Sequence, residues 1–449
     1  MGIKPDMTSY TSDYFQELYE YCLQLLKEGK AYADDTDQKT MRDQRWDGLP
    51  SKRRDASAEE NLSHFEEMKM GSQEGVRWCI RAKISVDDNN KAMRDPVIYR
   101  CNPQSHVRTG TKWKMYPIYD FCCPIVDSLE GITHALRTME YRDRNPQYQW
   151  MLDALNLRKV HIWDFSRLNF VRTLLSKRKL AQFVDDGHVW GWDDPRFPTI
   201  RGIRRRGMTI EALREFILKQ GPSRNLINLD WTTFWATNKK YIDPIAPRHT
   251  AIHTKDAVTA TVKGARLSPF SEDKPKHGKN PDLGTKKVAY SPQILISQTD
   301  AQNFSQDEEI TLMNWGNAIV RSISHSLNPL HAKTVTSLEL ELHLQGDVKK
   351  TKQKITWLAT EGQELIPVEL VDFDYLIKKD KLEENDKLED FLTKQTEFRE
   401  KAYADGNVVE VKKDDIIQFE RIGYFRCDRP FEHGKPAVLF NIPTGKREK

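Results

Sequence analysis

The first regular pattern along the chain is that of an amphipathic helix. Behind capping residues at positions 11–13, apolar side chains recur every three or four residues until Gly29. These side chains are Phe15, Leu18, Tyr19, Cys22, Leu25 and Leu26. Residues 33–75 then become strongly polar and lose any apolar period, which predicts an exposed insertion rather than core. Apolar residues alternate again at 76–86 and 97–99, and this alternation predicts antiparallel strands within the insertion.

A different pattern runs from residue 115 to residue 180. Short apolar runs predict buried strands at 115–119 and 160–165, and helical spacing predicts helices within 124–134 and at 148–155. Strands that alternate with helices are typical of a parallel, doubly wound sheet. This part of the chain is therefore expected to have an α/β fold.

The remainder of the chain changes from helix to strand. A helix is expected from Thr209 to its end at Gly221, with Leu213 and Phe216 among the residues of its apolar face. Beyond about residue 245 the pattern is all-β. The strict period of two at 337–344 predicts a strand, and residues 355–358 are expected to face it across a turn. Further strand signals lie at 368–373, 416–419 and 424–426, and together they predict a β-barrel.

Two strongly charged runs interrupt this region, at 271–287 and 378–391. Both are expected to be loops or exposed helix faces. A charged run is usually a solvated surface, so neither is predicted to be a binding site.

Length and composition add few constraints. A chain of 449 residues is expected to form two or three domains, and its formal charge of only +4 gives no global reason to expect nucleic acid. No stretch approaches the roughly 20 apolar residues that a membrane helix requires, and the first residues show no targeting pattern. With neither a membrane helix nor a targeting pattern, the protein is expected to be cytosolic and without a membrane partner. The six cysteines form no C-x-x-C pair, which favours reduced thiols.

The densest cluster of candidate chemistry lies at 174–180. Ser176 is followed by Lys177, Arg178 and Lys179, directly after a predicted strand. A small hydroxyl among cations, between a strand and a helix, suits the binding of a polyphosphate. The alternative, that this is simply a solvated basic surface, stays open.

A second cluster lies around Tyr119 and Asp120. Residues at the carboxyl end of a strand line the ligand crevice of a doubly wound sheet, so both are placed to contact a small substrate. Arg137 could then pair bidentately with a carboxylate. Equally open is a structural interpretation, in which Tyr119 packs in the core and Arg137 forms a bridge to Glu130 or Glu140.

A third cluster combines aromatic residues with arginines. Trp190 and Trp192 precede Arg196, Arg201, Arg204 and Arg205. Aromatic rings interleaved with arginines suit an RNA strand through stacking and phosphate contacts. A buried tryptophan pair with a charged rim explains the composition equally well. No Gly-rich nucleotide fingerprint, P-loop, H-E-x-x-H or G-x-S-x-G motif occurs, which argues against the commonest hydrolases and NTPases.

Taken in order, three segments resemble one family. The segments YDFCCPIVDSLEGITHALRTMEYRDRN, IWDFSRLNFVRTLLSKRKL and GWDDPRFPTIRGIRRRGMTIEALREFI are similar to the glutamyl- and glutaminyl-tRNA synthetases, and most similar to the eukaryotic cytosolic glutamyl branch. The resemblance runs from the GIKPD start through KKYIDPIAPRH to the final barrel.

This resemblance implies a fold and a division into domains. The family has a Rossmann-type catalytic core with an inserted acceptor-end subdomain, followed by a C-terminal β-barrel region that binds the anticodon. On this basis residues 1–240 are expected to be catalytic, with the insertion at about 33–115 and a helical connection at about 196–240. Residues 241–449 are expected to bind the anticodon.

The resemblance also implies an activity. The family attaches an amino acid to tRNA with ATP through an aminoacyl-adenylate intermediate, so L-glutamate, tRNA(Glu) and ATP with Mg²⁺ are the expected substrates. Magnesium accompanies the ATP, and no structural metal is expected. A glutaminyl-tRNA synthetase and a noncatalytic tRNA-binding fragment are the alternative functions.

Site residues carry over to matching positions. The resemblance assigns ATP binding to Glu140 and to the loop residues Leu174, Leu175, Ser176, Lys177 and Arg178, with Lys177 and Ser176 as the catalytic pair. It assigns amino-acid binding to Tyr119, Asp120, Phe121, Cys122, Cys123 and Arg137. The arginines at 196, 201, 204 and 205 are expected along the tRNA path.

One motif of the family is missing. The HIGH motif, its first strand and the nearby arginine with which the family reads the substrate carboxylate do not precede Met1. The closest sequence to the motif, Glu432-His433-Gly434, lies in another context. The chain is therefore expected to be an amino-terminally incomplete synthetase. Members of this family join multi-synthetase assemblies through an N-terminal extension, which is expected to lie outside these residues.

Overall fold

The structure is a computed structural model that describes residues 2–255, 257–327, 334–383 and 385–445. Residue 384 of the charged run and residues 446–449 of the expected barrel region lie outside the described residues. The chain forms two compact units. Unit 1 comprises Met1–Arg167 and Pro222–Leu226, and unit 2 comprises Leu168–Gly221 and Ile227–Lys449.

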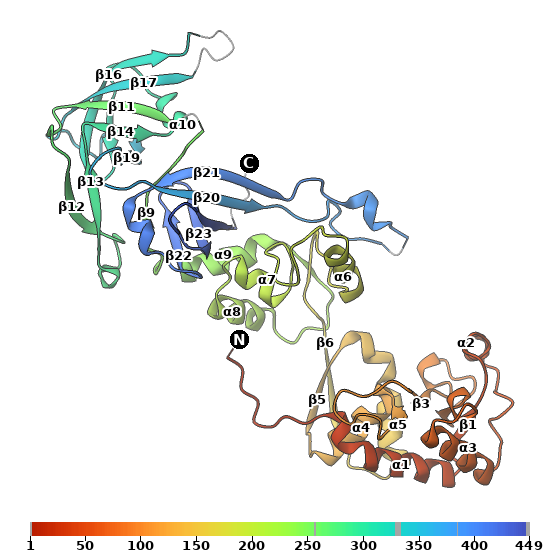
Figure 1. The fold of residues 1–449 in the computed structure, drawn as a ribbon. Coiled ribbons are helices and arrows are strands. Elements are labelled where there is room, and N and C mark those ends of the chain that lie inside the picture. The colour runs from red at the N-terminus through yellow and green to blue at the C-terminus, as the bar shows by residue number, and fades with distance from the viewer. Residues whose placement is uncertain (1, 256, 328–333, 384, 446–449) are drawn as a thin grey trace. The chain divides into compact units, whose positions relative to one another are not determined.

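The first half of unit 1 packs helices against a four-stranded antiparallel sheet of order β1-β2-β3-β4 (Figure 1). The predicted first helix is confirmed as α1, and the strands predicted at 76–86 and 97–99 are confirmed as β2 and β3. The elements are η1 (Thr11–Tyr14), α1 (Phe15–Lys27), β1 (Ala31–Asp34), α2 (Gln38–Asp47), α3 (Ala58–Met70), β2 (Cys79–Ala82), β3 (Val97–Cys101) and β4 (Met115–Pro117).

The prediction that residues 33–75 lie outside the core is wrong for α3. Phe65 and Met68 are fully buried and pack in one core with Leu18 and Leu25 of α1. Leu62 packs against the same core, and most of the remaining residues of α3 are polar. So few apolar positions produce no visible period in the sequence.

The second half of unit 1 contains the expected β-α-β arrangement. β5 (His134–Thr138) and β6 (His161–Phe165) pair in parallel, and α5 (Asn145–Ala154) connects them. The helix predicted at 148–155 and the strand predicted at 160–165 are confirmed. Between β5 and α5 lies the short helix η4 (Met139–Arg144). Figure 1 shows β5 and β6 side by side in unit 1.

Two local predictions in this half are wrong. The strand at 115–119 ends at Pro117 in the antiparallel sheet, and Tyr119 already begins α4 (Tyr119–Leu129). The helix expected within 124–134 therefore starts earlier, and His134 lies on β5 instead. Pro124, at the start of the stretch expected to be a turn and helix, lies inside α4.

The helical part of unit 2 confirms the helix predicted from Thr209. The Thr209 side chain accepts a hydrogen bond from the Ala212 N–H and caps α8, and Gly221 follows the last residue with a φ of 65°. The elements of this part are β7 (Asn169–Phe170), α6 (Lys177–Asp185), α7 (Ile200–Arg205), α8 (Ile210–Gln220), β8 (Asn228–Leu229) and α9 (Trp231–Ile242).

The rest of unit 2 is built on two seven-stranded sheets. The first has the order β10-β21-β20-β24-β23-β22-β9, and the second has the order β18-β15-β16-β17-β11-β14-β19. Strands of the first sheet are β9 (Arg248–His249), β10 (Ala251–His253), β20 (Ile366–Phe373), β21 (Glu397–Ala404), β22 (Ile416–Phe419), β23 (Gly423–Arg429) and β24 (Ala437–Ile442). Strands of the second are β11 (Val258–Lys263), β14 (Gln293–Ile296), β15 (Glu309–Leu312), β16 (Gly316–His325), β17 (Val335–Leu342), β18 (Lys354–Ile355) and β19 (Trp357–Ala359).

Both sheets close into barrels in the same way, through a short bend between their two edge strands. In the first sheet the two edge strands, β9 and β10, are separated in sequence only by Thr250. In the second, the edge strands β18 and β19 are separated only by Thr356. One bent stretch of chain therefore forms both edges of each sheet, which leaves neither sheet as an open, flat surface. The expected barrel region is confirmed, as two barrels.

Two details of the barrel prediction differ from the structure. β17 (335–342) pairs with β16 and β11, so residues 355–358 do not face it. The charged run at 271–287 forms most of a two-stranded ribbon of β12 (Phe270–Pro275) and β13 (Thr285–Tyr290). β12 is solvated on both faces and therefore shows no apolar alternation.

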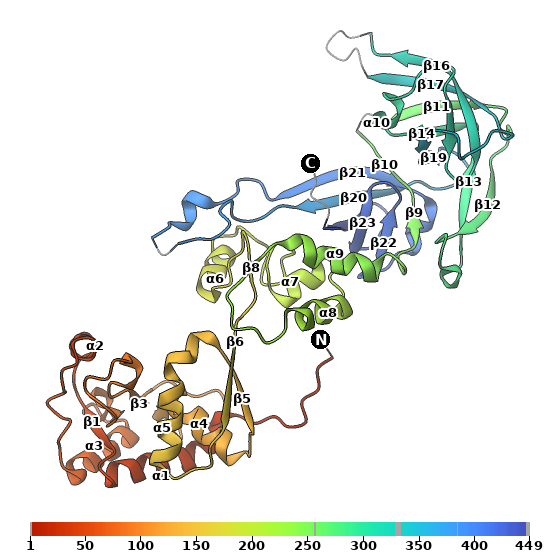
Figure 2. The ribbon, with the colours of Figure 1, turned by 180° about the vertical axis from the view of Figure 1, so that it is seen from behind.

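The second charged run contains the short helix η7 (Leu388–Phe391) and otherwise lacks helix and strand in its described residues, as expected of a loop. Its leucines nevertheless pack on α6. Leu382 and Leu388 contact the cluster that includes Leu180 and Phe183. Figure 2 shows the long β20–β21 ribbon leading to this segment beside α6.

Candidate active site

The side chain of Arg137 lies at the centre of a polar hollow in unit 1. Along β5, exposed and buried residues alternate, and Arg137 is on the buried face with only 8% of its surface exposed. Its guanidinium carbon lies 5.8, 5.2 and 5.3 Å from the ring centres of Tyr119, Tyr141 and Tyr148. The Nε and Nη1 groups of Arg137 have no hydrogen-bond partner among the described residues.

This environment decides between the two interpretations of Arg137. Within the described chain it bridges to neither predicted partner, because Glu130 accepts from the Tyr14 hydroxyl and Glu140 pairs with Arg167. A buried cation with two unused donors is costly unless a ligand satisfies them. Planar guanidinium donors match a carboxylate best. The structural interpretation of Arg137 as a surface bridge is therefore wrong.

Further unpartnered polar atoms gather around the same hollow. Among the described residues, Asp120 Oδ1 and Gln147 Nε2 are buried without a hydrogen bond. The other carboxylate oxygen of Asp120 accepts from Arg144 Nη1 at 2.5 Å. The hollow therefore offers donors from Arg137 and Gln147 together with an acceptor from Asp120. These donors and the acceptor match the charges of a small molecule that carries both a carboxylate and an ammonium group, although the hollow has no free volume for one in this structure.

The predicted stretch 119–123 divides between the hollow and the core. Tyr119, Asp120 and Cys123 line the hollow. Phe121 is fully buried and Cys122 is 6% exposed, and both pack in the core of unit 1. Burial raises the pKa of the Tyr119 hydroxyl, so this ring presents a neutral hydroxyl at physiological pH.

Glu140 lies on η4, next to the strand that carries Arg137. Its carboxylate forms an ion pair with Arg167 Nε at 2.9 Å. A hydrogen bond from the Thr138 side chain, together with the Arg167 charge, lowers the pKa of Glu140. The carboxylate is therefore ionised at neutral pH and half-exposed.

A broad cleft in unit 1 is bordered by basic side chains that the sequence analysis did not single out. Arg42, Arg45, Arg100 and Arg144 line it, and the Trp46 ring is 67% exposed at its rim. Cations beside an exposed aromatic ring suit a single-stranded nucleic acid. Residues 42–46 lie in the segment expected to be a solvated excursion, and scattered arginines in such a segment give no spacing signal.

The basic cluster at 174–180 lies in unit 2 and forms the start of α6. Ser176 is the N-cap residue, and Lys177, Arg178 and Lys179 occupy the first turn without any acidic residue there. Leu174 is buried and packs with Leu180 and Phe183, which fixes the loop on the helix. Cations are unfavourable at the positive end of a helix, whereas an anion is stabilised there. The exposed Lys177 and Arg178 therefore favour an anionic ligand at this terminus.

The arginines predicted along the tRNA path fall into two groups in unit 2. Arg196 is almost buried and binds Asp194 through two bonds of 2.9 and 2.7 Å. Arg205 binds Asp428 through bonds of 2.8 and 2.9 Å. Arg201 and Arg204 are exposed on α7.

The two tryptophans of this cluster are partly exposed. Trp190 is 45% and Trp192 is 40% exposed. The interpretation as a fully buried pair is therefore wrong. Trp190 packs one face against Phe373 and Phe440, and the guanidinium carbon of Arg205 lies 5.3 Å from its ring centre.

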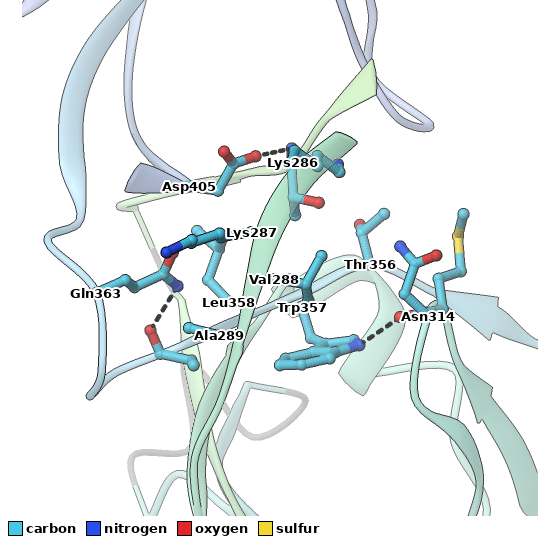
Figure 3. A pocket seen from close by; sticks show the side chains of 13 residues that line it. Lys286, Lys287, Val288, Ala289, Asn314, Thr356, Trp357, Leu358, Gln363 and Asp405 are labelled. Carbon is cyan, nitrogen blue, oxygen red and sulfur yellow. Dashed lines mark hydrogen bonds between the residues drawn. The ribbon is translucent and has the colours of Figure 1, made fainter. Parts of the chain in front are cut away.

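A small cavity lies where the two barrels of unit 2 meet (Figure 3). Lys286 and Asp405 are nearly buried in its wall. The chain itself satisfies them, since Lys286 Nζ donates to the Arg248 carbonyl at 2.6 Å and Asp405 Oδ2 accepts from the Thr250 N–H at 2.7 Å. This cavity is therefore part of the barrel junction rather than a ligand site.

Comparison with known families agrees with this architecture. The family model described as tRNA synthetases class I (E and Q), catalytic domain, matches residues 1–244. Two models of the anti-codon binding domain of the same synthetases match residues 246–341 and 354–428. The chain therefore belongs to the class I tRNA synthetases of the E and Q type.

Similar curated proteins extend over the whole chain. A protein of Schizosaccharomyces pombe named "Probable glutamate--tRNA ligase, cytoplasmic" is 62% identical over 446 residues, which cover 99% of this chain and 62% of that protein. The "Glutamate--tRNA ligase, cytoplasmic" of Saccharomyces cerevisiae is 58% identical over 447 residues, again 99% of this chain and 62% of that protein. The protein of the same name from Arabidopsis thaliana is 51% identical over 450 residues, or 100% of this chain and 62% of that one.

The chain thus spans about 62% of the length of these relatives.

All six cysteines are free. None of the helices in the described part of the chain combines the length and the apolar character that crossing a membrane requires.

Proposed function

We propose that this protein attaches L-glutamate to tRNA(Glu) in the cytoplasm, using ATP and a glutamyl-adenylate intermediate. The observation that carries the proposal is the buried guanidinium of Arg137, whose Nε and Nη1 have no partner among the described residues. The cytoplasmic glutamate ligases to which the chain is 51–62% identical support both the reaction and the compartment.

Recognition of glutamate is assigned to the hollow around Arg137. The guanidinium binds the side-chain carboxylate, and Asp120 receives the α-ammonium group. Tyr119 and Cys123 line the same space, whereas Phe121 and Cys122 shape it from the core. Glutamine offers a single amide oxygen and no negative charge to a guanidinium that can only donate, so the site favours glutamate over glutamine.

Activation of glutamate is assigned to the loop Leu174–Arg178 and to Glu140. The first turn of α6 binds the ATP phosphates, with Ser176 at its cap and Arg178 beside Lys177. Lys177 stabilises the charge that develops as the glutamate carboxylate attacks the α-phosphate and pyrophosphate leaves. Magnesium enters with the nucleotide and neutralises phosphate charge, without a carboxylate cage of its own.

Binding of tRNA is assigned to the barrels and to exposed arginines. The anti-codon models that match 246–341 and 354–428 support a boundary near residue 241 between catalytic and anticodon-binding parts. Arg201 and Arg204 supply phosphate contacts, whereas Arg196 and Arg205 hold the surface in shape through Asp194 and Asp428.

The proposal extends to assembly with other synthetases. A mouse protein named "Bifunctional glutamate/proline--tRNA ligase" is 46% identical over 453 residues, and the match covers 99% of this chain but 30% of that protein. A sequence of this kind therefore occurs within a longer synthetase polypeptide, which supports association with a further synthetase.

The test is ATP–pyrophosphate exchange in the presence of tRNA, with glutamate and glutamine compared in parallel. Exchange with glutamate alone is the expected result. Exchange with glutamine alone would assign the protein to the glutaminyl branch instead. Binding of tRNA without exchange for either amino acid would favour a noncatalytic tRNA-binding role for these 449 residues.

A further inference from the structure

Two carboxylates flank Arg137, and neither is bonded to it. Asp164 of β6 is the register partner of Arg137 across the parallel strands, on the same buried face. Asp127 of α4 lies behind Tyr148, whose ring centre is 5.3 Å from the guanidinium carbon. Within the described chain, no ion pair or hydrogen bond joins Arg137 to either carboxylate.

Each carboxylate is instead held by a neutral donor. The Tyr148 hydroxyl donates to Asp127 Oδ2 at 2.8 Å, and Asn145 Nδ2 donates to Asp164 Oδ2 at 2.8 Å. Tyr148 and Asn145 both belong to α5, one turn apart. The same helix therefore provides both donors.

We propose that Tyr148 and Asn145 are positioning residues that keep Asp127 and Asp164 off Arg137, so that its N–H groups remain available to the carboxylate of the substrate. This proposal rests on the proposed function, in which Arg137 binds glutamate.

The physical argument concerns competition for one buried cation. A carboxylate in a low-dielectric site needs hydrogen-bond donors, and the Arg137 guanidinium is a charged donor whose field reaches Asp127. Burial, together with the Glu130 charge, raises the pKa of Asp127 overall, although the Tyr148 hydrogen bond and the Arg137 charge act to lower it. If the hydroxyl is removed, Asp127 loses its donor and pairs with Arg137. The internal ion pair then competes with the substrate for the same N–H groups.

The decisive variants are Tyr148→Phe, Asp127→Asn and the two together. Glutamate binding to the 449-residue chain is measured by calorimetry. We expect the Kd of Tyr148→Phe to rise about tenfold or more, since a bond to a charged group is at stake. Asp127→Asn alone should bind within about threefold of the wild type, because its amide oxygen still accepts from Tyr148. The double variant should recover most of the lost affinity, because an uncharged side chain competes weakly for Arg137.

The matched control is Tyr14→Phe. The Tyr14 hydroxyl also donates to a carboxylate of unit 1, Glu130 Oε1, at 2.9 Å, but away from the hollow. It should leave the Kd for glutamate unchanged. For the carboxylate on β6, the Kd for glutamate is compared between Asn145→Ala and the double variant Asn145→Ala with Asp164→Asn.

A second readout does not depend on binding. A crystal structure of Tyr148→Phe should show a carboxylate oxygen of Asp127 within ion-pair distance of an Arg137 nitrogen. Affinity unchanged in Tyr148→Phe would overturn the proposal, and so would an affinity that Asp127→Asn fails to restore. A wild-type chain that binds no glutamate would overturn the proposed amino-acid site as well, and that failure is recognised because it precedes any substitution.

Discussion

Arg137 and Asp164 are neighbours across two parallel strands, and in the described structure each has a buried side-chain atom without a hydrogen-bond partner. Adjacent strands lie about 4.8 Å apart, so opposite charges at one register position would ordinarily pair. Asp164 is instead bonded to Asn145, and the guanidinium is enclosed by tyrosine rings. The arrangement leaves Arg137 as an unused cation inside the fold, which is the property that a carboxylate-binding site requires.

Replacing Arg137 by lysine should weaken glutamate binding about 10- to 100-fold, because a single ammonium cannot form the two parallel bonds of a guanidinium. The preference for glutamate over glutamine should fall with it. Calorimetric titration with both amino acids checks this expectation. Arg142→Lys, at an exposed position of η4, is the control and should bind glutamate normally. An Arg137→Lys variant with unchanged discrimination would contradict the assignment.

The sequence could indicate Arg137 as a candidate but could not establish its role. Burial argues against a bridge on the surface, and the burial of Arg137 follows from its place on the inner face of β5. That strand is only five residues long and contains two charged or titratable side chains, so no alternation marks it. The partner carboxylates are still less visible, because Asp127 and Asp164 reach the site from α4 and β6.

Lys177 should matter for the rate of activation rather than for tRNA binding. It lies in the first turn of α6 among cations that only an anion can stabilise. Lys177→Ala should lower the rate of ATP–pyrophosphate exchange by about 100-fold or more, as loss of a charge-stabilising group does. Affinity for tRNA should change less than about twofold, because Lys177 is assigned to the phosphates of ATP and not to those of tRNA. Lys219→Ala, which removes an exposed lysine of α8, is the control for charge. An unchanged exchange rate would disprove the role of Lys177.

The exposed and the paired arginines of the third cluster should differ in their effects on tRNA binding and on stability. Arg201 and Arg204 are exposed, so replacing both by glutamine should weaken tRNA binding and leave stability unchanged. Each lost phosphate contact should reduce the slope of log K against log salt by about 1. Filter binding over a series of salt concentrations measures the slope. A slope equal to that of the wild type would remove both residues from the tRNA path.

Arg196→Gln should instead lower the stability of the protein. Asp194 is fully buried, and Arg196 supplies the charge that balances it. Removing that charge should lower the free energy of unfolding by about 3–5 kcal/mol, as expected for one partner of a buried pair. Urea unfolding followed by tryptophan fluorescence measures this change. A variant as stable as the wild type that binds tRNA weakly would restore Arg196 to the tRNA path.

The fold could be predicted where one element carries its own signal, as α1 and α8 do through their periods and caps. Which strands pair with one another could not be predicted from the sequence. The strict alternation of 335–342 reveals a strand with one buried face, but nothing in it names β11 and β16 as neighbours. Closure of each barrel depends on a bend at Thr250 or Thr356, where the chain passes from one sheet edge to the other. A single residue between two short strands leaves no distinct pattern.

The junction of the barrels should depend on the ionised form of Asp405. The carboxylate is nearly buried and lies 3.2 Å from His249 Nδ1. Burial by itself would raise the pKa of Asp405, but His249, Lys286 and the Thr250 N–H together hold this pKa far below its usual range. A carboxyl group whose pKa is lower in the folded state stabilises the fold at pH values above its unfolded pKa of about 3.9. That contribution is lost as the pH falls towards the folded value.

Asp405→Asn should therefore lower the free energy of unfolding of unit 2 by about 3 kcal/mol at pH 7. The difference from the wild type should shrink below about pH 4, because the unfolded wild-type chain then takes up a proton at this carboxyl whereas the folded protein does not. Urea unfolding of both proteins at several pH values measures the difference. Asp307→Asn is the control, since Asp307 forms an exposed pair with Arg321 and should change stability by less than about 0.5 kcal/mol. A stability difference that stays constant from pH 7 to pH 3 would show that the charge of Asp405 does not stabilise the junction.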